Sequence, residues 1–308
     1  MTAEQFVRSS KAGETAASQK PAREKKAPSF PANPEPLQIA VYDNHCHLEF
    51  EFDDELGVMP WQENLDRAQS VGVKGVVQVG VTLDSSKWCA ELARKDLRVL
   101  AAVALHPNEA PLYKTRENLD AAIAQIEALA KQPRVRAIGE TGLDFFRTEG
   151  ENDLELQQHS FEEHIRIAKE NDIALMIHDR DAHDQVVETL LRVGAPDKVV
   201  FHCYSGETDL AQICIDNGWY MSFAGNITIK RNQHLRDSLI MAPKELILVE
   251  TDAPFLAPEP FRGRPNAPYL VPITVRFMAE QRGIDVNELA AQLALNTESV
   301  YGSWAEGF

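Results

Sequence analysis

The stretch LQIAVYDNHCHLEF, residues 37–50, joins an apolar run directly to a dense group of polar side chains. Its first six residues are mostly apolar, as expected of a parallel strand that is buried on both faces. The next residues include an aspartate, two histidines and a cysteine within five positions, starting at Asp43. The stretch therefore predicts a buried strand with a functional group of side chains at its carboxyl end.

Seven further apolar runs follow, and each is nearly continuous. They are VKGVVQVGV (73–81), RVLAAVAL (98–105), VRAIG (135–139), IALMI (173–177), KVVF (198–201), WYMSFAG (219–225) and LILVE (246–250). Segments with a helical period separate them, such as residues 154–170, where Leu154, Phe161, Ile165 and Ala168 are expected on one side. Eight β/α units in roughly 270 residues predict an α/β protein with a TIM-type (β/α)8 barrel. A doubly wound open sheet is the alternative.

Residues 1–36 are rich in Pro, Ala, Ser, Lys and Glu and offer almost no periodic apolar residues. Such a segment cannot bury enough surface to offset its ordering entropy, so we predict a disordered tail. Residues 37–308 are then expected to form a single barrel domain. Its last two helices are predicted within residues 271–283 and 285–302, and Asp285 is the expected N-cap of the second.

The composition is typical of a globular protein, with 44% apolar and 25% charged residues. The 31 basic and 47 acidic residues give a formal charge of -16, which repels polyanions at long range. The four cysteines form no CxxC pair. Neither a transmembrane run nor the apolar core of a signal peptide is evident. We therefore expect a cytoplasmic protein with reduced thiols and no membrane partner.

Ionisable residues that can bind metals follow most of the predicted strands. Five of the nine histidines are among them. The carboxyl ends of the strands form the rim where barrel enzymes build their active sites. The rim residues are His45, His47, His106, Glu140, His178, His202 and Asp252.

Six of these residues, all except His106, form a set of nitrogen and oxygen ligands without a thiolate. Imidazole favours transition metals such as Zn, Mn, Ni or Fe, and the carboxylates also suit Mg. Six ligands are too many for one closed tetrahedral zinc, but they suit two metals that share a bridging carboxylate. Two metals about 3.5 to 4 Å apart activate water and neutralise an in-line displacement at phosphate. The pattern therefore indicates hydrolysis.

Seven motifs add a more specific indication. They are DNHCHLEF (43–50), LHPNEA (105–110), IGETGLDFFR (138–147), MIHDRDAHD (176–184), VFHCYSG (200–206), VETDAPFLAP (249–258) and FRGRPNAPYLVP (261–272). In their order and register the chain resembles the TatD family of metal-dependent deoxyribonucleases, within the amidohydrolase superfamily. The resemblance covers nearly everything except the tail. It implies a divalent-metal-dependent hydrolase that cleaves phosphodiester bonds in DNA with a metal-activated water.

The resemblance also implies roles for the ligands. In the family both histidines of the HxH motif bind the first metal, and these are His45 and His47 here. The glutamate of the GExGLD motif bridges the two metals and corresponds to Glu140. The histidines of the IH and HC motifs bind the second metal and correspond to His178 and His202.

The aspartate of the family's ETD motif completes the first site and assists the attacking water, which implies this role for Asp252. Glu140 and Asp252 are therefore the expected catalytic residues. The expected cofactors are two divalent cations, Mg, Mn or Zn. DNA is the expected partner, and the acidic net charge favours short or single-stranded DNA.

Contacts with the substrate are expected beside this ligand set. His106 resembles the first histidine of a family HPH motif whose second histidine is Asn108 here, and support of the metal site is its alternative role. Arg147 and Arg180 follow the strands of two ligands and could hold a phosphate, with surface ion pairs as the alternative. The Gly- and Pro-rich segment 261–266 lies after the last strand, where barrels often bind phosphate. The candidates are His106, Arg147, Arg180, Arg262, Arg264 and Asn266.

The sequence is also compatible with two other functions. The superfamily also hydrolyses amides, lactones and aminoacyl esters, although many of those enzymes use a carboxylated lysine where this chain has Glu140. A non-catalytic scaffold stabilised by metal is the second alternative, but a structural site needs only four closed ligands.

The alternation of an extended strand assigns the side chains of the opening stretch to two faces. Asp43, His45 and His47 share one face, and Asn44 and Cys46 share the other. We therefore expect the two histidines to project into the barrel mouth. Cys46 should pack behind the site without binding metal, and Asp43 should lie deeper, where it can orient a ligand.

Overall fold

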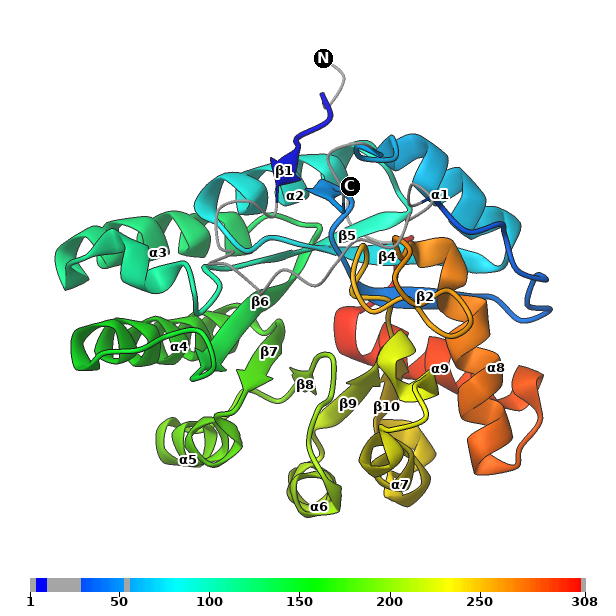
Figure 1. The fold of residues 1–308 in the computed structure, drawn as a ribbon. Helices are drawn as coiled ribbons and strands as arrows, with labels where there is room; N and C mark the ends of the chain where they lie inside the picture. The colour runs from blue at the N-terminus through cyan, green and yellow to red at the C-terminus, as the bar shows by residue number, and fades with distance from the viewer. Residues whose placement is uncertain (1–3, 10–28, 53–55, 306–308) are drawn as a thin grey trace, which may run out of the picture.

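The computed structural model describes residues 4–9, 29–52 and 56–305 of the 308-residue chain. Strands follow one another around the fold and helices lie on the outside (Figure 1). The fold is a TIM-type (β/α)8 barrel, as predicted. Each of the eight apolar runs contains or overlaps one barrel strand.

The barrel strands are arranged in their order along the chain, and every neighbouring pair is parallel. They are β2 (Val41–Cys46), β4 (Val73–Val79), β5 (Val99–Val103), β6 (Val135–Asp144), β7 (Ala174–Arg180), β8 (Val199–Phe201), β9 (Tyr220–Phe223) and β10 (Ile247–Val249). A parallel bridge between Cys46 and Ala253 joins the two ends of the sheet. This closure excludes the doubly wound open sheet.

The helices alternate with the strands and pack outside them (Figure 1). They are α1 (Trp61–Ser70), α2 (Leu83–Lys95), α3 (Arg116–Ala130), α4 (Glu151–Asn171), α5 (His183–Val193), α6 (Thr208–Asn217), α7 (Gln233–Met241), α8 (Val271–Arg282) and α9 (Val286–Tyr301). Within the described residues, none of them has the length and apolar character needed to cross a membrane. Asp285 caps α9 as predicted, because its carboxylate accepts the amide protons of Asn287 and Glu288. Leu154 of α4 is only partly buried, whereas Phe161, Ile165 and Ala168 are buried.

Alternating side chains of the strands fill two separate apolar cores. Leu100 and Ala102 of β5 point into the barrel, while Val99 and Ala101 pack against the helices. Trp304 follows α9 and stacks on Tyr42 of β2, with 4.0 Å between the ring centroids. The amino ends of the strands are thus filled with apolar side chains, and the polar site is confined to the carboxyl ends.

Gly142 allows β6 and β7 to approach closely beside the predicted site. It pairs with His178 in the strand register and has a φ of +139°, which L side chains rarely adopt. A Cβ atom at this position would lie 2.0 Å from the carbonyl oxygen of His178. The glycine therefore holds the strand of Glu140 against the strand of His178.

Parts of the predicted disordered tail contact the barrel. The two-residue strand β1 (Arg8–Ser9) pairs with β3 (Phe50–Glu51), and the Arg8 guanidinium lies 3.5 Å from the buried carboxylate of Glu49. Residues 29–36 are held by arginines that donate to backbone carbonyls, including those of Phe30, Pro31, Glu35 and Pro36. These contacts correct the prediction for residues 4–9 and 29–36. The rest of the predicted tail lies outside the described residues.

We expect the substitution Gly142→Ala to lower the free energy of unfolding by at least about 3 kcal/mol, because it combines backbone strain with a steric clash. Gly218→Ala is the matched control, since Gly218 also has a positive φ (+69°) but its Cβ would meet no atom within 4 Å. The control should cost only about 1 kcal/mol. Denaturant unfolding of both variants measures the difference. Equal costs would show that the close approach to His178 is unimportant.

Candidate metal centre

The six side chains predicted as metal ligands converge at the carboxyl ends of the strands. His45, Glu140 and His178 lie within β2, β6 and β7, and the other three lie just after β2, β8 and β10. Glu140 and His178 are inside strands because β6 and β7 extend further than the apolar runs predicted. Together with His106, the six residues form three overlapping groups of potential ligands: His45, His202 and Asp252; His45, His47 and Glu140; His106, Glu140 and His178.

The first ligand set surrounds one side of Glu140. The Nε2 atoms of His45 and His47 are 3.1 Å apart. Glu140 Oε2 lies 3.6 Å from His45 Nε2 and 3.8 Å from His47 Nε2. Asp252 Oδ1 lies 3.7 Å and 3.6 Å from the same two nitrogens. Four ligand atoms therefore face one another across a small space.

The second set surrounds the other oxygen of Glu140. Glu140 Oε1 lies 2.7 Å from His178 Nδ1, 2.9 Å from His202 Nε2 and 3.3 Å from His106 Nε2. His106, predicted as a substrate contact, is thus a member of this cluster. The two oxygens of a single carboxylate face different groups of imidazoles.

The donor atoms and their separations suit divalent cations. A tetrahedral cation that binds each ligand atom at about 2.1 Å separates those atoms by about 3.4 Å. The distances of 3.1 to 3.8 Å in the first set bracket this value. Three imidazoles around one carboxylate oxygen form a second candidate set of nitrogen and oxygen ligands.

The imidazoles and the carboxylate shift one another's protonation. Burial would raise the pKa of Glu140, but the charges of His202 and His106 and hydrogen bonds from the histidines hold it well below its usual range. Burial would lower the pKa of His202, but Glu140 and then Glu250 outweigh this effect and raise it well above the ordinary value. Glu140 is therefore a carboxylate, ready to bind a cation.

Carboxylates behind the ligands hold two of the imidazoles. Asp144 Oδ2 lies 3.2 Å from His178 Nε2 and accepts a 2.9 Å hydrogen bond from the amide of Asn108. Glu250 Oε1 lies 3.4 Å from His202 Nδ1 and accepts the amide proton of Cys203 at 2.6 Å. Carboxylates of this kind fix the orientation of metal-binding histidines.

Sequence reasoning assigned no role to Asp144 or Glu250, but strand alternation could have identified both. Asp144 is four residues after Glu140 on β6, so the two side chains share a face. Glu250 is two residues before Asp252. The signal is the even spacing of carboxylates at the carboxyl ends of β6 and β10.

The opening stretch has the two faces that alternation predicted. Asp43 accepts hydrogen bonds from the amide and the hydroxyl of Thr251, at 2.9 and 2.5 Å. His45 Nδ1 lies 3.0 Å from the sulfur of Met176, at the top of the inner apolar core. The thiol of Cys46 instead points toward the Val77 carbonyl oxygen, at 3.7 Å, in the outer core. Cys46 is therefore outside the ligand groups, as expected.

A left-handed backbone turns Asp252 into the barrel mouth. Its φ is +54°, a conformation that aspartate tolerates better than most residues. Its amide donates to the His45 carbonyl at 2.9 Å, and its own carbonyl accepts the Phe255 amide proton at 2.9 Å. The turn after β10 thus places the last carboxylate opposite the two histidines of β2.

The predicted substrate contacts are in different environments. Arg147 and Arg262 are exposed. Arg180 lies over the ring of Phe146, with its Cζ atom 3.9 Å from the centroid. Arg264 donates to the carbonyl oxygens of Ser29 and Phe30, and Asn266 is buried with its amide donated to the Thr251 carbonyl. Arg264 and Asn266 are therefore occupied by contacts within the chain.

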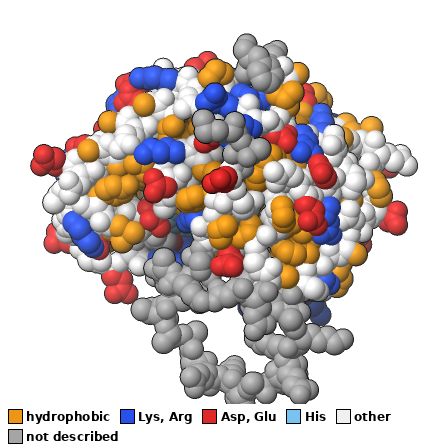
Figure 2. All heavy atoms as spheres, turned by 90° about the horizontal axis from the view of Figure 1, so that it is seen from above, with side chains coloured by type: hydrophobic (Ala, Val, Ile, Leu, Met, Phe, Trp, Pro, Cys, Tyr) orange, Lys and Arg blue, Asp and Glu red, His pale blue; other side chains and the backbone are white. Residues whose placement is uncertain are grey.

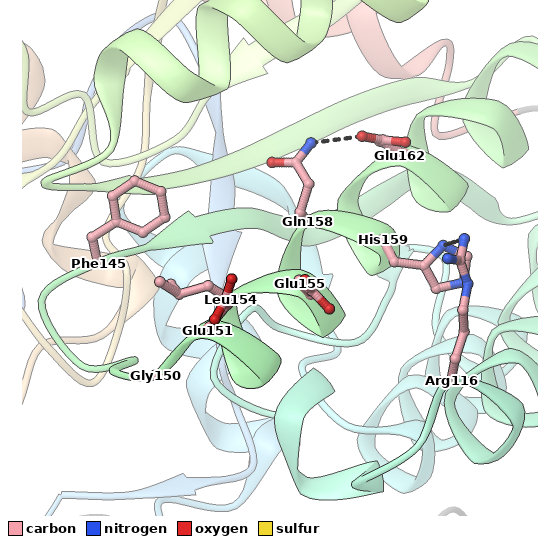
Figure 3. Close-up of a pocket in the computed structure, with 9 residues that line it drawn as sticks. All are labelled: Arg116, Phe145, Gly150, Glu151, Leu154, Glu155, Gln158, His159 and Glu162. Atoms are coloured by element: carbon pink, nitrogen blue, oxygen red, sulfur yellow. Dashed lines mark hydrogen bonds between the residues drawn. The ribbon is translucent and has the colours of Figure 1, made fainter.

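A large surface hollow lies away from the ligand cluster. Its volume is about 860 Å³, and it is formed mainly by α4 with contributions from Arg116 and Phe145 (Figure 3). Glu151, Glu155 and Glu162 line it. Three carboxylates outnumber the one arginine that lines the hollow, so its charge disfavours anions.

Comparison with known proteins identifies the family. The model of the family described as TatD related DNase matches residues 42–302. The chain is 41% identical over 241 residues to the "Uncharacterized metal-dependent hydrolase TatD" of Mycobacterium tuberculosis, which covers 77% of this chain and 89% of that protein. It is 33% identical over 244 residues to the "3'-5' ssDNA/RNA exonuclease TatD" of Erwinia amylovora, with 77% and 91% covered.

Solved structures agree with this comparison. The TatD homologue YJJV from Escherichia coli superposes with a TM-score of 0.77 at 28% identity and covers 85% of this chain and 98% of that one. An organophosphorus hydrolase from Deinococcus radiodurans has a TM-score of 0.57 at 16% identity, with 86% and 93% covered, which shows a shared fold. From the family match and the M. tuberculosis relative, the chain belongs to the TatD-related DNase family of metal-dependent hydrolases.

Proposed function

We propose that this protein uses two divalent cations to hydrolyse phosphodiester bonds in short or single-stranded DNA. The position of Glu140 carries the proposal, because each of its two carboxylate oxygens faces a separate group of ligands. The E. amylovora relative, named as an exonuclease of single-stranded DNA and RNA, supports the choice of substrate.

The residues that would hold the first cation are His45, His47, Asp252 and Glu140. Those that would hold the second are Glu140, His178, His202 and His106. His106 becomes a ligand in this proposal because its Nε2 lies 3.3 Å from the bridging carboxylate. The proposal leaves Mg, Mn and Zn open, because the ligands include both imidazoles and carboxylates.

When bound, the two cations would acidify a water and neutralise charge on the phosphate. Asp252 would orient this water and accept its proton, since its side chain is 15% exposed at the barrel mouth. Glu140 is almost completely enclosed and would hold the cations in place. Asp144 and Glu250 would keep His178 and His202 aligned.

The surface charge favours a short substrate. Lys and Arg side chains are interspersed with Asp and Glu side chains on the face seen in Figure 2. Tight binding of long duplexes comes from several cationic side chains that neutralise phosphates together. In a chain with a net charge of -16, local recruitment by the cations is the better explanation.

Removal and restoration of metal tests the proposal. Stripped protein should cut no labelled DNA, and addition of Mg, Mn or Zn should restore cleavage. Glu140→Gln and Asp252→Asn should each lower the rate at least about 100-fold, and Glu140→Gln should also lower the metal content. Glu259→Gln is the matched control, because Glu259 is an exposed carboxylate on the same rim and outside the ligand groups.

A panel of single-stranded DNA, duplex DNA, RNA, lactone and aminoacyl ester substrates distinguishes the alternatives. Chelator-insensitive cleavage, or full activity in Glu140→Gln, would contradict the two-cation phosphodiesterase. Turnover of lactone or ester without cleavage of any nucleic acid would favour the other chemistry of the superfamily. If metal added to the stripped protein restores its thermal stability but no turnover of any substrate, the protein is a non-catalytic scaffold.

We expect cation affinity to rise with pH. Protons compete with cations for imidazole nitrogens. Burial would lower the pKa of His178, but hydrogen bonds with Asp144 and Glu140 raise it above the ordinary value, so protonated His178 persists to higher pH. Titration calorimetry between pH 5.5 and about 8.5 should show up to about tenfold tighter binding per pH unit for each displaced proton. In Asp144→Asn this dependence should move to lower pH. An affinity that is constant with pH would exclude these histidines as ligands.

A further inference from the structure

An exposed aromatic ring and an arginine form a flat pair beside the metal centre. Phe146 is 59% exposed, and the Arg180 Cζ atom lies 3.9 Å from the centroid of its ring. The register of β6 and β7 produces this pair, because Asp144 is paired with Arg180 at the ends of the two strands. Among the described residues, Arg180 forms no ion pair with a carboxylate within 4.0 Å.

Both members of the pair lie close to His178, a candidate ligand of the second set. Asp144 accepts the amide proton of Phe146 at 3.0 Å, and the same carboxylate lies 3.2 Å from the ring of His178. Arg180 is two residues after His178 on β7, so both side chains share a face about 6.6 Å apart along the strand. The ring and the guanidinium are therefore held at a fixed position relative to the second ligand set.

We propose that Phe146 and Arg180 form a stacking platform for the nucleobase adjacent to the phosphate that is cut. This inference rests on the proposed function. Aromatic rings and guanidinium planes are the groups on which unpaired bases stack in single-stranded nucleic acids. The platform accepts any base, because every base offers a flat face.

The neighbouring residues make this position different from an ordinary exposed apolar side chain. Phe145, the residue before Phe146, is partly buried and lines the acidic hollow (Figure 3). Phe146 does not line the hollow, and its exposed ring is paired with the guanidinium of Arg180. Phe146 and Arg180 thus combine an exposed flat surface and a cation beside the carboxylate that contacts His178.

Four variants test the platform with single-stranded DNA. Phe146→Ala and Phe146→Leu should raise KM about 5- to 100-fold with kcat changed less than about threefold, because stacking contributes to binding. Phe146→Tyr should restore the KM, since it keeps the ring. Leu191→Ala is the control, because Leu191 is 60% exposed on α5. Metal content, measured for each variant, should equal that of the unmodified protein.

Abasic substitution identifies the base on the platform. For the unmodified protein, the KM should be higher for a strand that lacks the base next to the cut than for the intact strand. For Phe146→Ala, the two KM values should be equal. If Phe146→Ala has the KM of the unmodified protein and the unmodified protein cuts DNA, the proposed function stands and the platform proposal is wrong. Loss of metal or of kcat in Phe146→Leu and Phe146→Tyr would also overturn it, because it would assign Phe146 to support of Asp144. If the unmodified protein cuts no phosphodiester with any cation, the proposed function fails as well.

Discussion

The Glu140 carboxylate is the constraint on which the rest of the site depends. It is 5% exposed and lies among five imidazoles, each with a ring nitrogen within 3.8 Å of one of its oxygens. A buried carboxylate is costly unless cations or hydrogen-bond donors surround it, and the buried His202, whose pKa is raised by Glu140 against the effect of burial, likewise needs a negative charge. Each group therefore makes the burial of the others possible. The barrel makes this arrangement feasible because five different strands deliver their carboxyl ends to one place.

The sequence predicted the fold and the convergence of the candidate ligands for a physical reason. A strand buried on both faces must be apolar along its length, so each run identified one strand, and the first polar residues after a run had to lie on the rim. His45 and His47 followed from this rule together with strand alternation. The rule was less accurate for β6 and β7, where Glu140 and His178 lie inside the strands because pairing continues through Asp144 and Arg180.

Contacts between distant segments were beyond the reach of sequence reasoning. Arg264 has the charge and the loop position of a phosphate clamp, yet its guanidinium donates to the carbonyl oxygens of Ser29 and Phe30. Nothing local reveals that residues far away in the chain will supply these acceptors. Arg8 and the buried Glu49 are a similar case, since the acid needs a cation that comes from a segment predicted to be disordered. A prediction of disorder from composition applies to the segment as a whole. Single hydrogen bonds and ion pairs of arginines can nevertheless attach parts of it to the barrel.

The acidic net charge and a polyanionic substrate are compatible if binding does not depend on a basic surface. Release of counterions from many phosphates gives most nucleic-acid-binding proteins their affinity, and it needs many cationic side chains. Two cations at Glu140 would supply concentrated positive charge at one phosphate, and the Phe146 ring would supply apolar contact at the neighbouring base. Affinity would then depend weakly on strand length, because both contacts lie within about one nucleotide of the cut. Such a division between metal and ring would let Arg180, stacked on Phe146, act at one base and one phosphate instead of along a long backbone.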